Sequence, residues 1–159
     1  MIHYLKGDAT SPQSDTDIKI IMHICNDVGA WGAGFVLALS KKWAKPEIEY
    51  KKWKKTFPDK FKLGNIRQVY VGDGIYVVNM IAQKLGKKYQ PPIRYSALDK
   101  CLIKLSYFAQ ETKDKYGKTV SIHAPRIGCG LAGGTWDEIE YFINKHLSEF
   151  DVYIYDFEQ

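Results

Sequence analysis

Pro125-Arg126-Ile127-Gly128-Cys129-Gly130-Leu131-Ala132-Gly133-Gly134 is the stretch from which the architecture of this chain is best inferred. It lies between a β-like run, residues 119–124, and a helical segment, residues 136–147. Its glycines permit positive φ angles and leave no Cβ between the main chain and a ligand. The N–H groups of such a turn, with the positive end of the following helix dipole, attract an anion. The stretch predicts a phosphate or diphosphate site, the alternative being a tight connection without a ligand.

A second glycine-rich turn, Asn26-Asp27-Val28-Gly29-Ala30-Trp31-Gly32-Ala33-Gly34, follows the apolar run 18–25 and leads into another apolar helix start. Ligands of open α/β sheets bind at the carboxyl edge of the strands, where both turns are expected. Two such turns favour a diphosphate-bearing ligand over a single phosphate. Asn26 and Asp27 end a strand, where they either meet ribose hydroxyls or close an Asx turn. Trp31 is expected either to plug against the neighbouring helix or to form a wall of the pocket.

Composition limits the class of protein. A chain of 159 residues suits one domain, residues 1–159, and 45% hydrophobic with 26% charged residues is ordinary for a soluble globular protein. No apolar run approaches the roughly 20 residues of a membrane span. The first residues lack the features of a signal peptide. We therefore expect a cytoplasmic monomer without a membrane partner.

The cysteines and histidines do not indicate a metal or a cofactor, and none is expected. Cys25, Cys101 and Cys129 have no ligand-like spacing and indicate reduced thiols. Cys129 is either a small filler between two glycines or a nucleophile. The filler is favoured, because no base can be identified beside the thiol. His23 and His123 lie mid-strand, which favours hydrogen-bonded core imidazoles.

Much of the net charge of +5 comes from a lysine-rich segment, residues 41–62, in which aromatic residues alternate with the lysines. Lysine with aromatics is one pattern of a nucleic-acid surface. The preferred interpretation is an amphipathic helix that buries Trp43, Tyr50 and Trp53 and leaves its lysines solvated.

The predicted elements alternate between β and α. A hairpin is indicated by the turn Gly72-Asp73-Gly74. The expected strands are residues 2–6, 18–25, 66–71, 75–79, 119–124 and 151–155, and the expected helices are 34–42, 46–55, 95–116 and 136–147. This order predicts a three-layer α/β/α domain with a central mixed sheet.

These pieces, taken together, resemble a macrodomain, the ADP-ribose-binding family, over essentially the whole chain. The resemblance rests on Gly7-Asp8-Ala9-Thr10 after the first strand, on Asn26-Asp27 with Gly32-Ala33-Gly34, on the run 125–131, and on Asn79-Met80-Ile81-Ala82-Gln83. The bacterial branch that it resembles is similar to the terminal ADP-ribose protein glycohydrolases and to ADP-ribose-1''-phosphate processing enzymes.

The resemblance implies where a ligand would lie. Asp8 would accept the exocyclic amine of adenine and the Ala9 N–H would meet a ring nitrogen, whereas Phe157 would either stack on adenine or pack as the chain end. The residues implied for the diphosphate and the distal ribose are Gly32, Ala33, Gly34, Gln83, Arg126, Gly128, Cys129, Gly130 and Leu131.

The resemblance also implies chemistry, with one departure. The related glycohydrolases use a lysine near the second strand of the hairpin and an aspartate after the G-C-G-L turn, where this chain has Gln83 and Ala132, with Lys84 one residue later. We expect a hydrolase that removes ADP-ribose from modified macromolecules through an ester-type bond, with Asn26, Asp27 and Lys84 as catalytic residues. A 1''-phosphate phosphatase and a non-catalytic reader remain alternatives. The expected partner is ADP-ribose or an ADP-ribosylated macromolecule, with nucleic acid only if ADP-ribosylated or through the lysine-rich segment.

Overall fold

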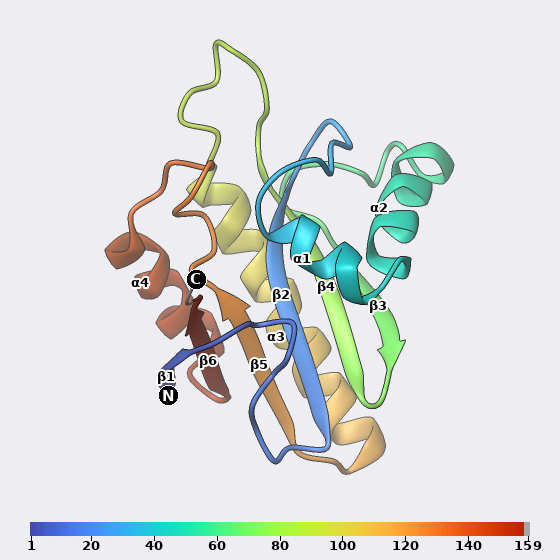
Figure 1. Ribbon diagram of the computed structural model, residues 1–159, viewed down its shortest axis with the longest axis vertical. Coiled ribbons are helices and arrows are strands. Elements are labelled where there is room, and N and C mark those ends of the chain that lie inside the picture. The colour runs from blue at the N-terminus through green and yellow to red at the C-terminus, as the bar shows by residue number, and fades with distance from the viewer. Residues whose placement is uncertain (158–159) are drawn as a thin grey trace.

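A six-stranded sheet with two helices on each face forms the molecule (Figure 1). The computed structural model describes residues 1–157. The elements are β1 (Ile2–Lys6), β2 (Ile18–Asn26), α1 (Phe35–Lys42), α2 (Lys45–Thr56), β3 (Ile66–Gly72), β4 (Ile75–Gln83), α3 (Tyr95–Tyr116), β5 (Val120–Pro125), α4 (Trp136–Leu147) and β6 (Asp151–Asp156). Their types and order confirm the predicted α/β/α fold.

The strands lie in the order β1-β6-β5-β2-β4-β3. Only the β3–β4 hairpin is antiparallel, and the other neighbouring strands are parallel. Because β2 pairs with β5 on one side and β4 on the other, their carboxyl ends share one edge of the sheet. The two glycine-rich turns, which follow β2 and β5, therefore begin next to each other.

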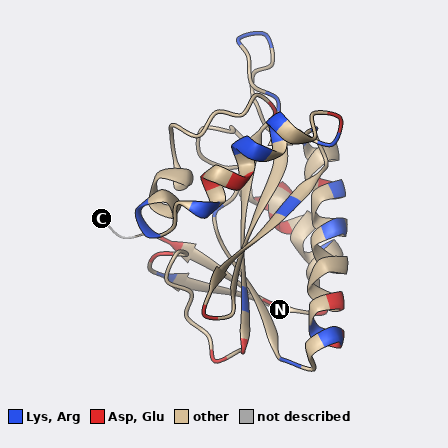
Figure 2. Ribbon diagram, turned by 90° about the vertical axis from the view of Figure 1, so that its right-hand side faces the viewer, with Lys and Arg blue, Asp and Glu red and all other residues tan. Residues whose placement is uncertain are grey.

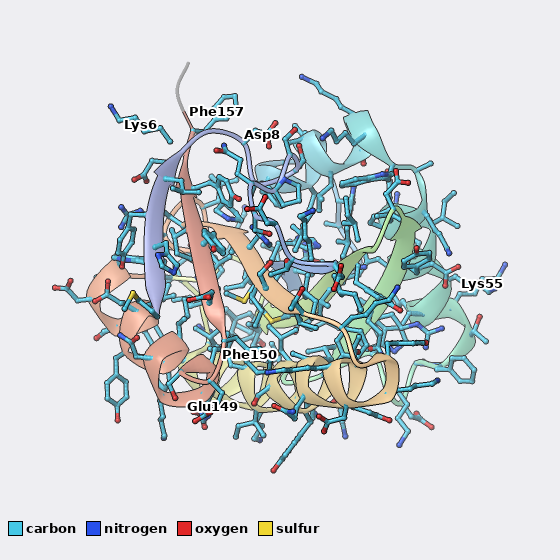
Figure 3. The ribbon with its side chains drawn as sticks, turned by 90° about the horizontal axis from the view of Figure 1, so that it is seen from below. Lys6, Asp8, Lys55, Glu149, Phe150 and Phe157 are labelled. Carbon is cyan, nitrogen blue, oxygen red and sulfur yellow. The ribbon has the colours of Figure 1, made fainter. Side chains whose placement is uncertain are left out.

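The sheet separates two apolar cores. Ile20 and Met22 of β2 pack with residues of α3 and α4, whereas Ile21 and Cys25 pack with residues of α1 and α2. This alternation follows the period of two along a strand. Figure 3 shows α3 and α4 on one side of the sheet and α1 and α2 on the other.

The lysine-rich segment forms most of α2 and its flanks. Tyr50 and Trp53 are buried and Trp43 is half-buried, while the lysines lie on the outer side of the helix (Figure 2). The structure thus confirms the amphipathic-helix interpretation. In the described part of the chain, no helix is both long and apolar enough to cross a membrane.

A buried polar network fastens the segment between β1 and β2 to the sheet. The Gln13 N–H donates to the Tyr155 hydroxyl over 2.6 Å, and that hydroxyl lies 2.9 Å from Nδ1 of His123. On the other side of the ring, Nε2 of His123 lies 2.7 Å from Ser121 Oγ, so both ring nitrogens have hydrogen-bond partners. Burial lowers the pKa of His123 to about 3, in keeping with a neutral ring and with the predicted core role.

Candidate functional site

A cavity of about 430 Å³ opens at the carboxyl edge of the sheet, between the turns that follow β2 and β5. We refer to residues 26–34 as the first loop and to residues 125–134 as the second loop. The cavity is lined by residues 23–26, 32–36, 125–128 and 130–132, with Ala30, Gln83, Leu85 and Pro92. The volume is in the range of small-molecule sites in proteins.

The side chain of Asn26 organises the first loop. Its Oδ1 accepts hydrogen bonds from the N–H groups of Val28 and Ala30, at 3.1 and 3.0 Å, and its Nδ2 donates to the Ala30 carbonyl. This is the Asx-turn alternative of the sequence analysis. Trp31 is buried, packs on Tyr50 and donates from Nε1 to Ser40, so it plugs against the helices rather than forming a cavity wall.

The end of the first loop presents unpaired donors to the cavity. Within the described chain, the N–H groups of Gly32, Ala33 and Gly34 have no hydrogen-bond acceptor. Gly34 has φ of 81°, which a residue with a side chain rarely adopts, and α1 begins directly after it. The first N–H groups of α1 have no acceptor in their own helix and add to this concentration of donors.

The second loop presents a similar set from the opposite wall. The N–H groups of Gly128, Gly130 and Leu131 have no acceptor among the described residues. A Cβ at Gly128 would lie 2.6 Å from the side chain of Ile139, so both this contact and a φ of 74° require glycine. Cys129 differs from its neighbours, because its N–H donates to the Arg126 carbonyl over 3.4 Å.

Cys129 does not line the cavity, whereas Arg126 does, with its guanidinium held by an acidic residue. The Cys129 side chain packs against the core, and burial raises the pKa of its thiol, which favours the filler interpretation. Arg126 donates from Nε and from a terminal nitrogen to the two carboxylate oxygens of Asp156, at 2.8 and 2.9 Å.

Of the three predicted catalytic residues, Asn26 lines the cavity, whereas Asp27 and Lys84 do not. Asp27 accepts the Leu85 N–H at Oδ1 over 3.0 Å, and its Oδ2 lies 3.9 Å from Nζ of Lys84. The Lys84 ammonium also lies over the ring of Tyr89, 4.6 Å from its centroid. Gln83, one residue earlier, does line the cavity.

Asp8, Ala9 and Phe157 lie beyond the cavity, at the carboxyl ends of β1 and β6. Asp8 Oδ1 accepts the N–H and the hydroxyl of Thr10, both at 2.8 Å, as a turn carboxylate does. The Gly7 N–H donates to the Asp156 carbonyl, which brings the residues after them, Asp8 and Phe157, to the same end of the molecule (Figure 3). Phe157 is 70% exposed, so it is not packed as a buried chain end.

Sequence reasoning missed the place of His23 in the cavity lining. Its Nε2 lies 2.5 Å from Oδ1 of Asn79, and Asn79 Nδ2 donates to the Pro46 carbonyl. Burial lowers the pKa of His23 to about 4, so the ring is neutral at pH 7. A mid-strand position predicted only a bonded core histidine. Among the described residues, no group of three or more His, Cys, Asp or Glu is arranged to hold a metal ion.

Comparison with solved structures gives close matches over almost the whole chain. A protein of unknown function from Bacteroides thetaiotaomicron is 46% identical with a TM-score of 0.89, and 98% of each chain is covered. A macrodomain protein from Streptomyces coelicolor is 40% identical with a TM-score of 0.83, covering 98% of this chain and 99% of that one. No protein-family model matches the chain.

Curated relatives differ in how much of their length corresponds to this chain. A chromodomain-helicase-DNA-binding protein 1-like from Danio rerio is 33% identical over 92% of this chain, which spans only 14% of that protein. An ADP-ribose 1''-phosphate phosphatase from Lodderomyces elongisporus is 23% identical, covering 98% of this chain and 99% of the phosphatase. The 40% identity over nearly all of the Streptomyces protein, with the same fold, shows that this chain belongs to the macrodomain family.

Proposed function

We propose that this protein binds ADP-ribose, with the diphosphate held between the first and second loops. The observation that carries the proposal is the convergence on one cavity of unpaired N–H groups, which belong to Gly32, Ala33, Gly34, Gly128, Gly130 and Leu131. Hydrogen bonds to a charged group contribute about 1.5–3 kcal/mol each. The choice of ADP-ribose as the diphosphate ligand is supported by the similarity to the Lodderomyces elongisporus protein, which is named an ADP-ribose 1''-phosphate phosphatase.

The adenine and the distal ribose of ADP-ribose would contact the remaining features of the site. Asp8, Ala9 and Phe157 would receive adenine, because Asp8 keeps Oδ2 outside its turn hydrogen bonds and the Ala9 N–H has no acceptor in the described chain. The distal ribose would lie toward Gln83 and Asn26, at the other end of the cavity.

We further propose that the protein hydrolyses a bond at the anomeric carbon of the distal ribose. Asp27 and Lys84 flank the cavity-lining residues Asn26 and Gln83, so they lie next to that ribose. Oδ2 of Asp27, which is not used by Leu85, would take a proton from water as the water oxygen bonds to the anomeric carbon. The bond from this carbon to a substrate carboxylate breaks, and the carboxylate leaves with the bonding electrons. The transition state would resemble an oxocarbenium ion, by analogy with glycosidases.

A second candidate is a non-catalytic reader of ADP-ribosylation. It is favoured by the chemistry of the lining, which contains no Asp, Glu or Lys among the described residues. His23 is neutral at pH 7, and Ala132 has no group for acid or base chemistry. In this case Asp27 and Lys84 only fasten the first loop to the segment after β4.

Calorimetry with free ADP-ribose tests the binding proposal, with ribose 5-phosphate as the ligand control. Micromolar binding of ADP-ribose is expected, and no heat at millimolar concentrations would overturn the proposal. Turnover is tested with ADP-ribose linked to glutamate, serine, arginine and DNA, together with ADP-ribose 1''-phosphate. Release from the glutamate ester identifies the hydrolase, and release of phosphate alone identifies a phosphatase.

The variants separate the hydrolase from the reader. Asp27→Asn is expected to abolish turnover while affinity for ADP-ribose stays within about tenfold, or 1.4 kcal/mol. Gly130→Ala is the control variant, because it is expected to weaken the binding of ADP-ribose and so shows how turnover changes when only binding is impaired. Binding without product from any substrate would establish the reader and exclude the hydrolase.

A further inference from the structure

Both ends of the second loop meet in one cluster of side chains behind the cavity. Arg126 stands at the start of the loop, and Trp136, the first residue of α4, follows its end. Tyr4 of β1 and Asp156 of β6 complete the cluster. We call these four residues the Arg126 clamp.

The guanidinium of Arg126 lies between two aromatic rings. Its Cζ is 4.9 Å from the centroid of Tyr4 and 4.9 Å from that of Trp136, while Asp156 holds its edge through two hydrogen bonds. The rings are joined to each other by a hydrogen bond of 3.1 Å from Trp136 Nε1 to the Tyr4 hydroxyl. A planar guanidinium can stack between two rings while its edge makes two parallel hydrogen bonds to one carboxylate, a bidentate geometry that an ammonium lacks.

The clamp joins the two ends of the second loop, and main-chain hydrogen bonds hold the interior of that loop. One of these comes from outside the loop, since the Ile93 N–H donates to the Ala132 carbonyl over 3.0 Å. Others run within the loop, from Gly134 to the Gly128 carbonyl, at 2.7 Å, and from Gly133 to the Gly130 carbonyl, at 3.0 Å. Glycines lose more conformational freedom on ordering than other residues. A fixed distance between the loop ends therefore restricts the free loop to conformations in which its N–H groups face the cavity.

We propose that Arg126 is a positioning residue, which holds the second loop in its diphosphate-binding form through the clamp. The effect on affinity rests on the proposed function. The Gly7 N–H donates to the main-chain carbonyl of Asp156, so this contact near Asp8 does not depend on the carboxylate of the clamp. Ordering the loop before binding removes an entropic penalty from the binding step.

Hydrogen exchange of the ligand-free protein tests the clamp without any ligand. Arg126→Lys and Arg126→Gln are compared with Arg67→Lys, a control in which the guanidinium lies 3.9 Å from Glu49 on another part of the surface. We expect faster exchange within residues 126–135 in both Arg126 variants and unchanged exchange in β2 and β4. Unchanged exchange in the loop would overturn the proposal, as would a uniform loss of protection across the sheet, which would make Arg126 a general structural residue.

Calorimetry then connects the loop to the ligand. Both Arg126 variants are expected to bind ADP-ribose at least about tenfold more weakly, with binding of adenosine, which has no phosphate, changed less than twofold. Equal losses for both ligands would contradict a role in the diphosphate loop. If the wild type does not bind ADP-ribose, the proposed function fails. Hydrogen exchange still tests whether the clamp orders the second loop. Should Arg126→Gln not fold, Asp156→Asn, at a half-exposed carboxylate, makes the same comparison.

Discussion

Replacing His123 with Gln should produce a stability penalty that shrinks as the solution becomes more acidic. The folded protein keeps this imidazole neutral, since burial lowers its pKa from 6.5 to about 3. Between these two values the unfolded chain binds a proton that the folded chain does not, so the contribution of His123 to stability falls as the pH falls. Gln has no titrating group and lacks this dependence.

The size of the effect follows from the two pKa values. At pH 7 both states are mostly neutral, whereas at pH 5 the unfolded state gains about 2 kcal/mol from protonation and the folded state gains almost nothing. Relative to wild type, the Gln variant loses the hydrogen bonds to Ser121 and Tyr155 at both pH values. The difference in unfolding free energy between the two proteins is therefore expected to be about 2 kcal/mol smaller at pH 5 than at pH 7.

Urea denaturation of both proteins at pH 7 and pH 5, at constant ionic strength, measures this difference. A penalty that is the same at both pH values would refute the reasoning, because it would mean that His123 titrates alike in the folded and unfolded states. NMR titration of the wild-type ring gives a check that does not depend on the variant. A ring that becomes protonated above pH 5 would contradict the lowering of its pKa by burial.

Three further predictions concern the second loop. Gly130→Ala should leave the unfolding free energy within about 0.5 kcal/mol, because an added Cβ has no neighbour within 4 Å, yet calorimetry should show weaker binding of ADP-ribose, since the methyl group occupies open space at the cavity. Gly134→Ala should destabilise the protein by about 1–3 kcal/mol in chemical denaturation, because its Cβ would lie 2.6 Å from the Gly128 carbonyl oxygen, and a wild-type midpoint would contradict this contact. Cys129→Ala should retain turnover of any substrate that the wild type cleaves, and a complete loss would restore Cys129 as a nucleophile.

The helices and strands were largely predictable, because their signals are local. The long helix, α3, has the predicted bounds, since its apolar residues repeat at the helical period and Gly117 adopts the left-handed conformation that ends it. The hairpin turn at residues 72–74 was equally clear, and there even Asp73 has a positive φ, of 52°.

The roles of individual side chains were less predictable, because they depend on contacts between distant segments. Arg126 belongs to a ligand loop in the sequence, but its guanidinium is held by Asp156, 30 residues away. Asp27 was expected to be catalytic, and the sequence did not predict that its carboxylate accepts the Leu85 N–H and lies near Lys84. A sequence motif gives the residue type at a position. The hydrogen-bond partner of that side chain can come from a distant segment, which the motif does not specify.

The order of residues by itself determined the alternation of strands and helices and the two glycine-rich loops, because backbone conformation and apolar period depend on near neighbours. Tertiary structure alone decided that β2 lies between β4 and β5, which places both loops at one cavity. It also decided which side chains remain available there. The physical reason is that hydrogen bonding and burial depend on which atoms share a small volume, and strand pairing over long sequence distances sets that volume.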